Sequence, residues 1–76
     1  MMTICVDVIA LKKIMVDRKL ETIKELSAIT GVNRNVLAKV LSNKATPSAQ
    51  TMIRIVEGLH LDPAVAGEIF FKRKLT

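Results

Sequence analysis

The chain of 76 residues is short, half of it is apolar, and it carries a net charge of +5 at pH 7. A chain of this length buries about 60% of its unfolded surface and has room for one core, so we expect one domain over residues 1–76. A single Cys and a single His exclude a disulfide framework or a Cys/His metal site within one chain. No apolar stretch is long enough for a membrane span, and no acid–base constellation or glycine-rich phosphate loop is present. We therefore expect a cytoplasmic protein without a membrane partner, a cofactor or enzymatic activity.

The positive charge is concentrated in the middle of the chain. Residues 26–56 contain Arg34, Lys39, Lys44 and Arg54 and no acidic residue, so they carry +4 of the net +5. A carboxylate near a phosphate would repel it, and a segment without acids therefore suits a surface that binds nucleic acid. Charge alone leaves open that this distribution is accidental.

The apolar pattern predicts an all-α chain of five short helices, with the first eight residues forming a short edge strand or an extended arm. Asp7 can cap the first helix. Thr22 and Glu25 have the spacing of a capping box at the start of the second helix, and Gly31 is suited to end that helix in the left-handed conformation.

Asn33 can cap a third helix over residues 34–42, and Asn43 can end that helix in the left-handed conformation. A fourth helix begins near Ser48, capped either by Ser48 or by Thr46 with Pro47 in the first turn, and Asp62-Pro63 begins a fifth. The expected buried positions in these helices are Val8, Leu11, Ile14, Met15, Ile23, Leu26, Ile29, Thr30, Leu37, Val40, Met52, Ile53, Val56, Leu59, Val65, Ile69 and Phe70.

Residues 22–43 form two helices joined by a short turn with a glycine, which is the pattern of a helix-turn-helix. The second helix of such a unit can enter the DNA major groove by its N-terminal end. Arg34 can donate two hydrogen bonds to guanine, Asn35 can pair with adenine, and Lys39 can reach guanine or phosphate. Val36 can pack on a thymine methyl group. These residues could also be an ordinary solvated helix face.

The same segment offers several groups for DNA phosphates. The candidates are Lys44, the amides at the start of the second helix near Thr22, and the side chains of Asn33 and Ser42. Thr22 is equally explained as a structural cap, so its part in binding stays open.

The run IKELSAITGVNRNVLAKVLSNK, residues 23–44, closely resembles the Cro/repressor-type (XRE-like) helix-turn-helix domain of phages and bacteria. The resemblance extends over about residues 8–71, and the ending Ile69-Phe70-Phe71 is similar to small phage Cro-like regulators. It implies a five-helix fold and a dimer on a two-fold-related operator that acts as a repressor or in a repressor–antirepressor switch. It also implies that Ala38 lies beside the base-reading residues.

The chain departs from the family's pattern at four positions. Ile23 stands where a Gln usually contacts phosphate, and Leu41 stands where an acidic residue is common and could cover core or belong to an interface. Asn43 and His60 replace frequent glycines, and both residue types tolerate positive φ better than most.

The ends of the chain carry more apolar side chains than a core this small is expected to bury. The candidate dimer interface consists of Ile4, Val6, Leu61, Phe70 and Phe71. The dimer would form through the fifth helix with the Phe pair, or through pairing of the two N-terminal arms. Residues 72–74, all basic, are expected to form a solvated tail that could reach flanking phosphates.

These observations favour a sequence-specific, double-stranded-DNA-binding transcriptional regulator, a Cro-like phage or prophage repressor that binds a palindromic operator as a homodimer. Two alternatives stay open. One is a protein-interaction module that binds a partner repressor as an antirepressor or modulator. The other is an antitoxin-type autorepressor, which would share the DNA chemistry.

Overall fold

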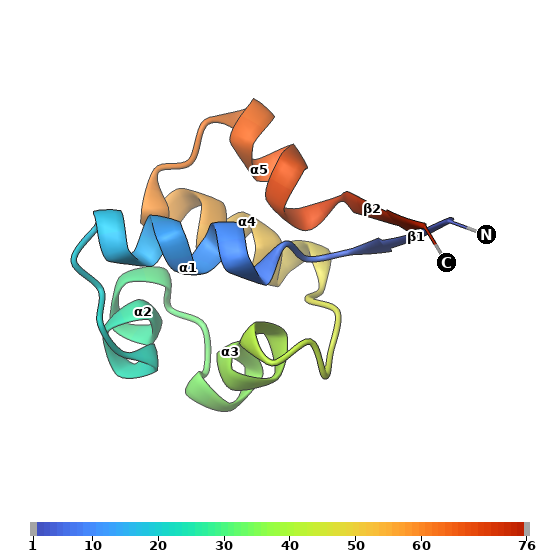
Figure 1. Ribbon diagram of the computed structural model, residues 1–76. Coiled ribbons are helices and arrows are strands. Elements are labelled where there is room, and N and C mark those ends of the chain that lie inside the picture. The colour runs from blue at the N-terminus through green and yellow to red at the C-terminus, as the bar shows by residue number, and fades with distance from the viewer. Residues whose placement is uncertain (1, 76) are drawn as a thin grey trace.

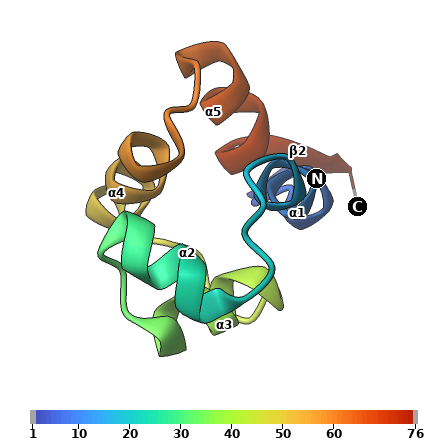
Figure 2. The ribbon, with the colours of Figure 1, turned by 90° about the vertical axis from the view of Figure 1, so that its left-hand side faces the viewer.

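Five helices and a two-stranded ribbon make up the computed structural model, which describes the backbone of residues 2–75 and the side chains of residues 5–72. The elements in chain order are β1 (Met2–Cys5), α1 (Val8–Asp17), α2 (Ile23–Thr30), α3 (Arg34–Leu41), α4 (Ala49–Leu59), α5 (Pro63–Phe70) and β2 (Lys72–Leu75). The α2 and α3 helices lie together on one side of the body and α5 lies on the opposite side, with α1 and α4 between them (Figures 1 and 2). The expected all-α class with five helices is confirmed. Within the described residues, no helix is both long and apolar enough to cross a bilayer.

Each helix begins at a capping side chain that accepts a backbone N–H of the first turn, as the sequence predicts. The caps are Asp7 for α1, Thr22 for α2, Asn33 for α3, Ser48 for α4 and Asp62 for α5. The capping box of α2 is complete, because the side chain of Glu25 accepts the amide of Thr22 in return. At α4 the cap is Ser48 and not Thr46, because the Ser48 hydroxyl accepts the amide of Thr51 at 3.2 Å.

Three helices end at a non-glycine residue in the left-handed region. These are Lys19 after α1, Asn43 after α3 and His60 after α4, with φ of 60°, 60° and 52°. At each of these helix ends, the amide of the next residue donates to the carbonyl five residues earlier, which is the long bond of a Schellman motif. The N···O distances are 2.8 Å from Leu20 to Met15, 2.8 Å from Lys44 to Lys39 and 3.0 Å from Leu61 to Val56. The turns at Asn43 and His60 therefore survive without glycine, as expected, whereas the turn at Lys19 was not predicted.

The core lies where all five helices meet, and its buried residues are Val6, Val8, Leu11, Met15, Leu26, Val32, Leu37, Val40, Ile55, Leu59, Ile69 and Phe70. Three predicted core positions are wrong, since Ile29, Ile53 and Val65 are exposed. On α4 the stripe passes instead through Ile55, which is fully buried. Neighbouring residues on a helix point about 100° apart, so Ile53 cannot share the face of Met52, whereas Ile55 can.

The two ends of the described chain pair with each other. β1 and β2 are antiparallel, with Met2 opposite Leu75 and Cys5 opposite Lys72 (Figure 1). The expected N-terminal arm is therefore a paired strand. The expectation that residues 72–74 form a solvated tail is wrong, because they belong to β2.

An ion pair joins this ribbon to the start of α1. The Lys72 Nζ lies 3.4 Å from the Asp7 carboxylate, and the Asp7 amide donates to the Ile69 carbonyl at 2.6 Å. The hydrogen bond from the Ala10 amide and the nearby Lys72 ammonium hold the pKa of Asp7 below its ordinary value. Asp7 thus both caps α1 and connects the ribbon to the helices.

The ribbon also changes the account of the apolar chain ends. Val6 and Phe70, two of the candidate dimer residues, are buried within the single chain and belong to its core. Phe71 remains 56% exposed and Leu61 half-buried, while the side chain of Ile4 lies outside the described ones.

Candidate nucleic-acid interface

The turn between α2 and α3 is held by side chains of α2. Gly31 ends α2 with φ of 75°, and Val32 then inserts into the core. The Ser27 hydroxyl donates to the Val32 carbonyl at 2.6 Å, and the Thr30 hydroxyl accepts the Val32 amide at 3.3 Å. These bonds fix the direction in which α3 begins. The role of Ser27 could not be predicted from the sequence, because a serine inside a helix has many uses.

The α3 helix is anchored on one side only. Leu37 and Val40 are almost completely buried, whereas Arg34, Asn35 and Lys39 are exposed. At about 100° per residue these three side chains, with Ala38, share the arc opposite the buried pair. The structure therefore brings together four of the five residues expected to face bases, on the first turn and a half of a firmly seated helix.

Val36 lies at the edge of this arc. It is 39% exposed, and it lines a small hollow beside the turn together with Asn33 and, from α4, Gln50 and Arg54. The Asn33 Oδ1 accepts the Asn35 amide at 2.7 Å, which leaves the Asn33 amide group as a donor at the mouth of the hollow.

The four phosphate candidates differ in whether their donors are already used. Near Thr22 the expected donors are backbone amides: the Thr22 amide donates to Glu25 Oε1 and the Glu25 amide donates to Thr22 Oγ1, both at 3.1 Å. The Ser42 hydroxyl donates to the Ala38 carbonyl at 2.9 Å. A phosphate contact from any of these three donors requires its present bond to break. Lys44 is exposed, just past the end of α3.

Arg54 belongs to the same surface although it lies in α4. One of its guanidinium nitrogens donates to the Gly31 carbonyl at 3.3 Å, which holds an exposed cation against the turn. The sequence places Arg54 in the acid-free segment but does not assign it to the site, because only the fold brings α4 next to the turn.

Glu25 is the acidic residue placed at the start of α2. Its carboxylate accepts the amides of Glu21 and Thr22, both at 3.1 Å. These amides and the positive end of the helix dipole partly offset its charge. The rest of the surface comes from the acid-free residues 26–56, so its described charged side chains are cationic.

A comparison with protein families supports what this geometry suggests. Residues 10–64 match the family described as the Cro/C1-type HTH DNA-binding domain. The match spans well over half of the chain, which therefore belongs to this family, and the protein is a helix-turn-helix DNA-binding regulator. Searches of curated proteins and of solved structures returned no match.

Proposed function

We propose that the protein is a sequence-specific transcriptional regulator, a Cro-like repressor, that inserts the N-terminal half of α3 into the DNA major groove. The observation that carries this proposal is the exposed arc of Arg34, Asn35 and Lys39 on a helix whose opposite side is buried. A seated helix presents its side chains in a fixed frame, which bidentate hydrogen bonds to bases require.

Each residue of the arc suits a different base edge. Arg34 donates to O6 and N7 of guanine, Asn35 pairs with N6 and N7 of adenine, and Lys39 reaches guanine or an adjacent phosphate. Ala38 leaves room for close approach, and Val36 meets a thymine methyl group at the side of the contact.

Phosphate contacts flank this arc. We assign them to Lys44, to the amide group of Asn33 and to Arg54, because these side chains are exposed. The amides near Thr22 and the Ser42 hydroxyl are secondary candidates, since the amides of Thr22 and Glu25 and the Ser42 hydroxyl already donate within the chain.

We further propose that two copies associate on a palindromic operator through the groove between α4 and α5. This groove has a volume of about 480 Å³, is floored by apolar residues such as Met52 and Val56, and is bordered by Phe71 and Ile53. Both bordering side chains are more than half exposed. A two-fold axis at this groove would let each Phe71 enter the partner's groove, burying apolar surface that one chain leaves in water.

The DNA proposal is tested by fluorescence anisotropy with a labelled duplex from beside the protein's own gene and a scrambled duplex of equal length. Each titration is run at two salt concentrations. Tighter binding to the native duplex with a steep salt dependence is expected. Equal, weak binding to both duplexes would contradict sequence-specific recognition of that site.

The residue assignments need variants with a matched loss of charge. Replacing both Arg34 and Lys39 with Ala should weaken operator binding by about 1–3 kcal/mol per base contact and reduce discrimination against the scrambled duplex. Replacing Lys12 and Lys13 with Ala removes the same charge from α1. That control should lose little discrimination, and an equal loss in the two variants would refute the assignment.

The dimer is tested by analytical ultracentrifugation at tens of micromolar protein. Phe71→Glu should shift the protein toward the monomer and weaken binding to a palindromic duplex more than binding to a half-site. Ile9→Glu places the same charge at an exposed apolar position of α1 and serves as the control. A wild-type protein that is monomeric both free and on the palindrome would refute this proposal.

A further inference from the structure

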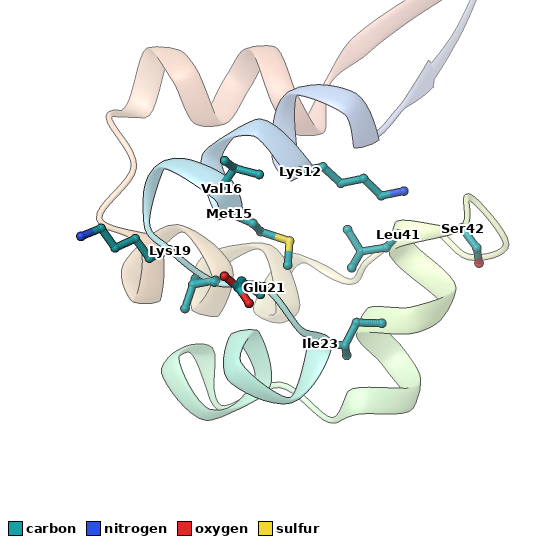
Figure 3. A pocket seen from close by; sticks show the side chains of 9 residues that line it. Lys12, Met15, Val16, Lys19, Glu21, Ile23, Leu41 and Ser42 are labelled. Carbon is teal, nitrogen blue, oxygen red and sulfur yellow. The ribbon is translucent and has the colours of Figure 1, made fainter.

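A second groove lies on the other side of the body, between α1, the start of α2 and the end of α3. It is open and has a volume of about 820 Å³. Its apolar lining comes from Met15, Leu20, Ile23 and Leu41, and Figure 3 shows Met15 and Leu41 pointing into the hollow. We call it the α1–α3 groove.

The apolar surface continues from the groove onto α1. Val16 lines the groove and is 73% exposed, and Ile9, two turns earlier on the same face of α1, is 69% exposed. These are the two most exposed large hydrophobic side chains in the described part of the chain. The core does not need either residue, and a water-facing β-branched side chain adds nothing to the stability of a helix.

The charges at the rim indicate what could cover this surface. Lys12 and Lys19 stand at opposite sides of the hollow (Figure 3). Lys13 is exposed next to Lys12, and Glu21 is the acid among the lining residues. Asp17 lies about 100° round the helix from Val16, away from the groove. The surface is therefore an apolar trough with Lys12 and Lys19 at two sides and one acid, Glu21, in its lining.

We propose that the α1–α3 groove binds an amphipathic helix of a partner protein, whose apolar stripe packs on Met15, Val16 and Leu41. Acidic residues about two turns apart on that helix face Lys12 and Lys19. Recognition through an apolar stripe with flanking charge is the usual way in which a groove selects one helix over another.

Two other occupants fit less well. A DNA backbone would gain from the lysines, but it would cover Met15, Val16 and Leu41 with a charged, hydrated chain. A second copy docked on the same groove about a two-fold axis would bring Lys12 and Lys19 of both copies together, and like charges at close range repel. The helical partner satisfies the apolar floor and the cationic rim at once.

The test uses a designed probe, a fluorescent amphipathic helical peptide with a leucine stripe and flanking glutamates seven residues apart. A second peptide carries lysines in place of these glutamates. The glutamate peptide should bind at least tenfold more tightly, and in NMR spectra of the labelled protein it should shift amides of α1, Ile23 and Leu41. Equal binding of the two peptides, absence of binding, or shifts centred elsewhere would overturn the proposal.

Three variants locate the site. Val16→Glu, at a position exposed enough to leave the fold intact, should weaken glutamate-peptide binding at least tenfold, whereas Ile53→Glu at the other groove should not. Replacing both Lys12 and Lys19 with Glu should reverse the preference, so that the lysine peptide binds more tightly. A circular dichroism melt confirms folding of each variant, and loss of binding in Ile53→Glu as well would refute the location.

These measurements separate the partner site from DNA binding. Val16→Glu should leave operator affinity unchanged, because Val16 is on α1 and away from the outer arc of α3. If Val16→Glu instead changes the sedimentation of the protein alone, the occupant is a second copy and the proposal is wrong.

Discussion

Gly58 offers a sharp test of how the helix-turn-helix is held against the body. It lies in α4 where that helix crosses α2, and a Cβ atom built on it would come within 2.8 Å of the Ile29 carbonyl oxygen and 2.9 Å of the Thr30 Cα. Real Cβ atoms essentially never approach other heavy atoms so closely. The Gly58→Ala substitution therefore forces α2 and α4 apart.

The size of the effect follows from two opposing contributions. Alanine in a helix interior is favoured over glycine by about 1 kcal/mol. Overpacking of a well-packed interior costs about 1–3 kcal/mol, and the upper half of that range applies here because the atoms in contact include backbone, which cannot rotate away. We therefore expect Gly58→Ala to lower the free energy of unfolding by about 1–2 kcal/mol.

Gly67 provides the matched control within the same chain. It lies inside α5, and a Cβ atom there would meet nothing within 4 Å. At this position the substitution changes only the helix propensity, which is higher for alanine than for glycine. Gly67→Ala should therefore raise the free energy of unfolding by about 0.5–1 kcal/mol.

Urea unfolding followed by circular dichroism at 222 nm measures both variants. Opposite signs for the two substitutions, with unchanged m-values, are expected. A stabilised Gly58→Ala protein would refute the close crossing of α2 and α4. Because α2 carries the turn that aims α3, we also expect Gly58→Ala to reduce operator affinity under conditions where the variant stays folded.

Three further predictions concern helix ends. Arg18 donates from two guanidinium nitrogens to the Leu59 carbonyl, at 3.2 and 3.0 Å, so Arg18→Met should lower the free energy of unfolding by about 1–2 kcal/mol in urea. The pKa of Asp7 is lowered in the fold, so its stabilisation is complete above its unfolded pKa of about 3.9 and is lost as the pH falls through the folded value. Asp7→Asn keeps the cap but loses the Lys72 pair, and its stability should depend less on pH between about 2 and 5. His60→Gly removes a left-handed non-glycine residue and should raise the free energy of unfolding by about 1 kcal/mol.

Each of these has a direct control. Arg18→Lys keeps the charge but loses the two-pronged geometry and should recover only part of the stability. Asp17→Asn changes an exposed acid at the end of α1, and a flattening of the pH profile equal to that of Asp7→Asn would contradict the role given to Asp7. His60→Ala cannot relieve the backbone, so stabilisation by alanine would show that the left-handed turn is not the cause.

Local signals were enough to predict most of the helical fold. A cap, a capping box or a helix-ending residue acts over three to five residues, so Thr22, Gly31 and Asp62 could be assigned from the chain alone. The exposed arc of α3 followed from the same periodicity, and with it the positions of Arg34 and Lys39.

What could not be predicted depends on residues far apart in the chain. Nothing near Lys72 indicates that it pairs with Cys5, and the burial of Val6 and Phe70 is likewise known only from the fold. The placement of Arg54 at the turn likewise needs α4 to pack against α2. The wrong prediction that Ile53 is buried has a different origin. An apolar residue next to a periodic apolar stripe is easily assigned to that stripe.

The β1–β2 ribbon implies an order of events in folding. Its register joins Met2 to Leu75, so closing it from an open chain requires a loop of about 70 residues, at an entropic cost of about 4 kcal/mol by the logarithmic law. The four residue pairs of the ribbon cannot offset this entropic cost alone. The helices, whose caps and turns are local, can form first and bring the two chain ends together. The ribbon is then the last element to form and the first to open. Backbone amides of β1 should exchange with solvent well before those of α2 and α4.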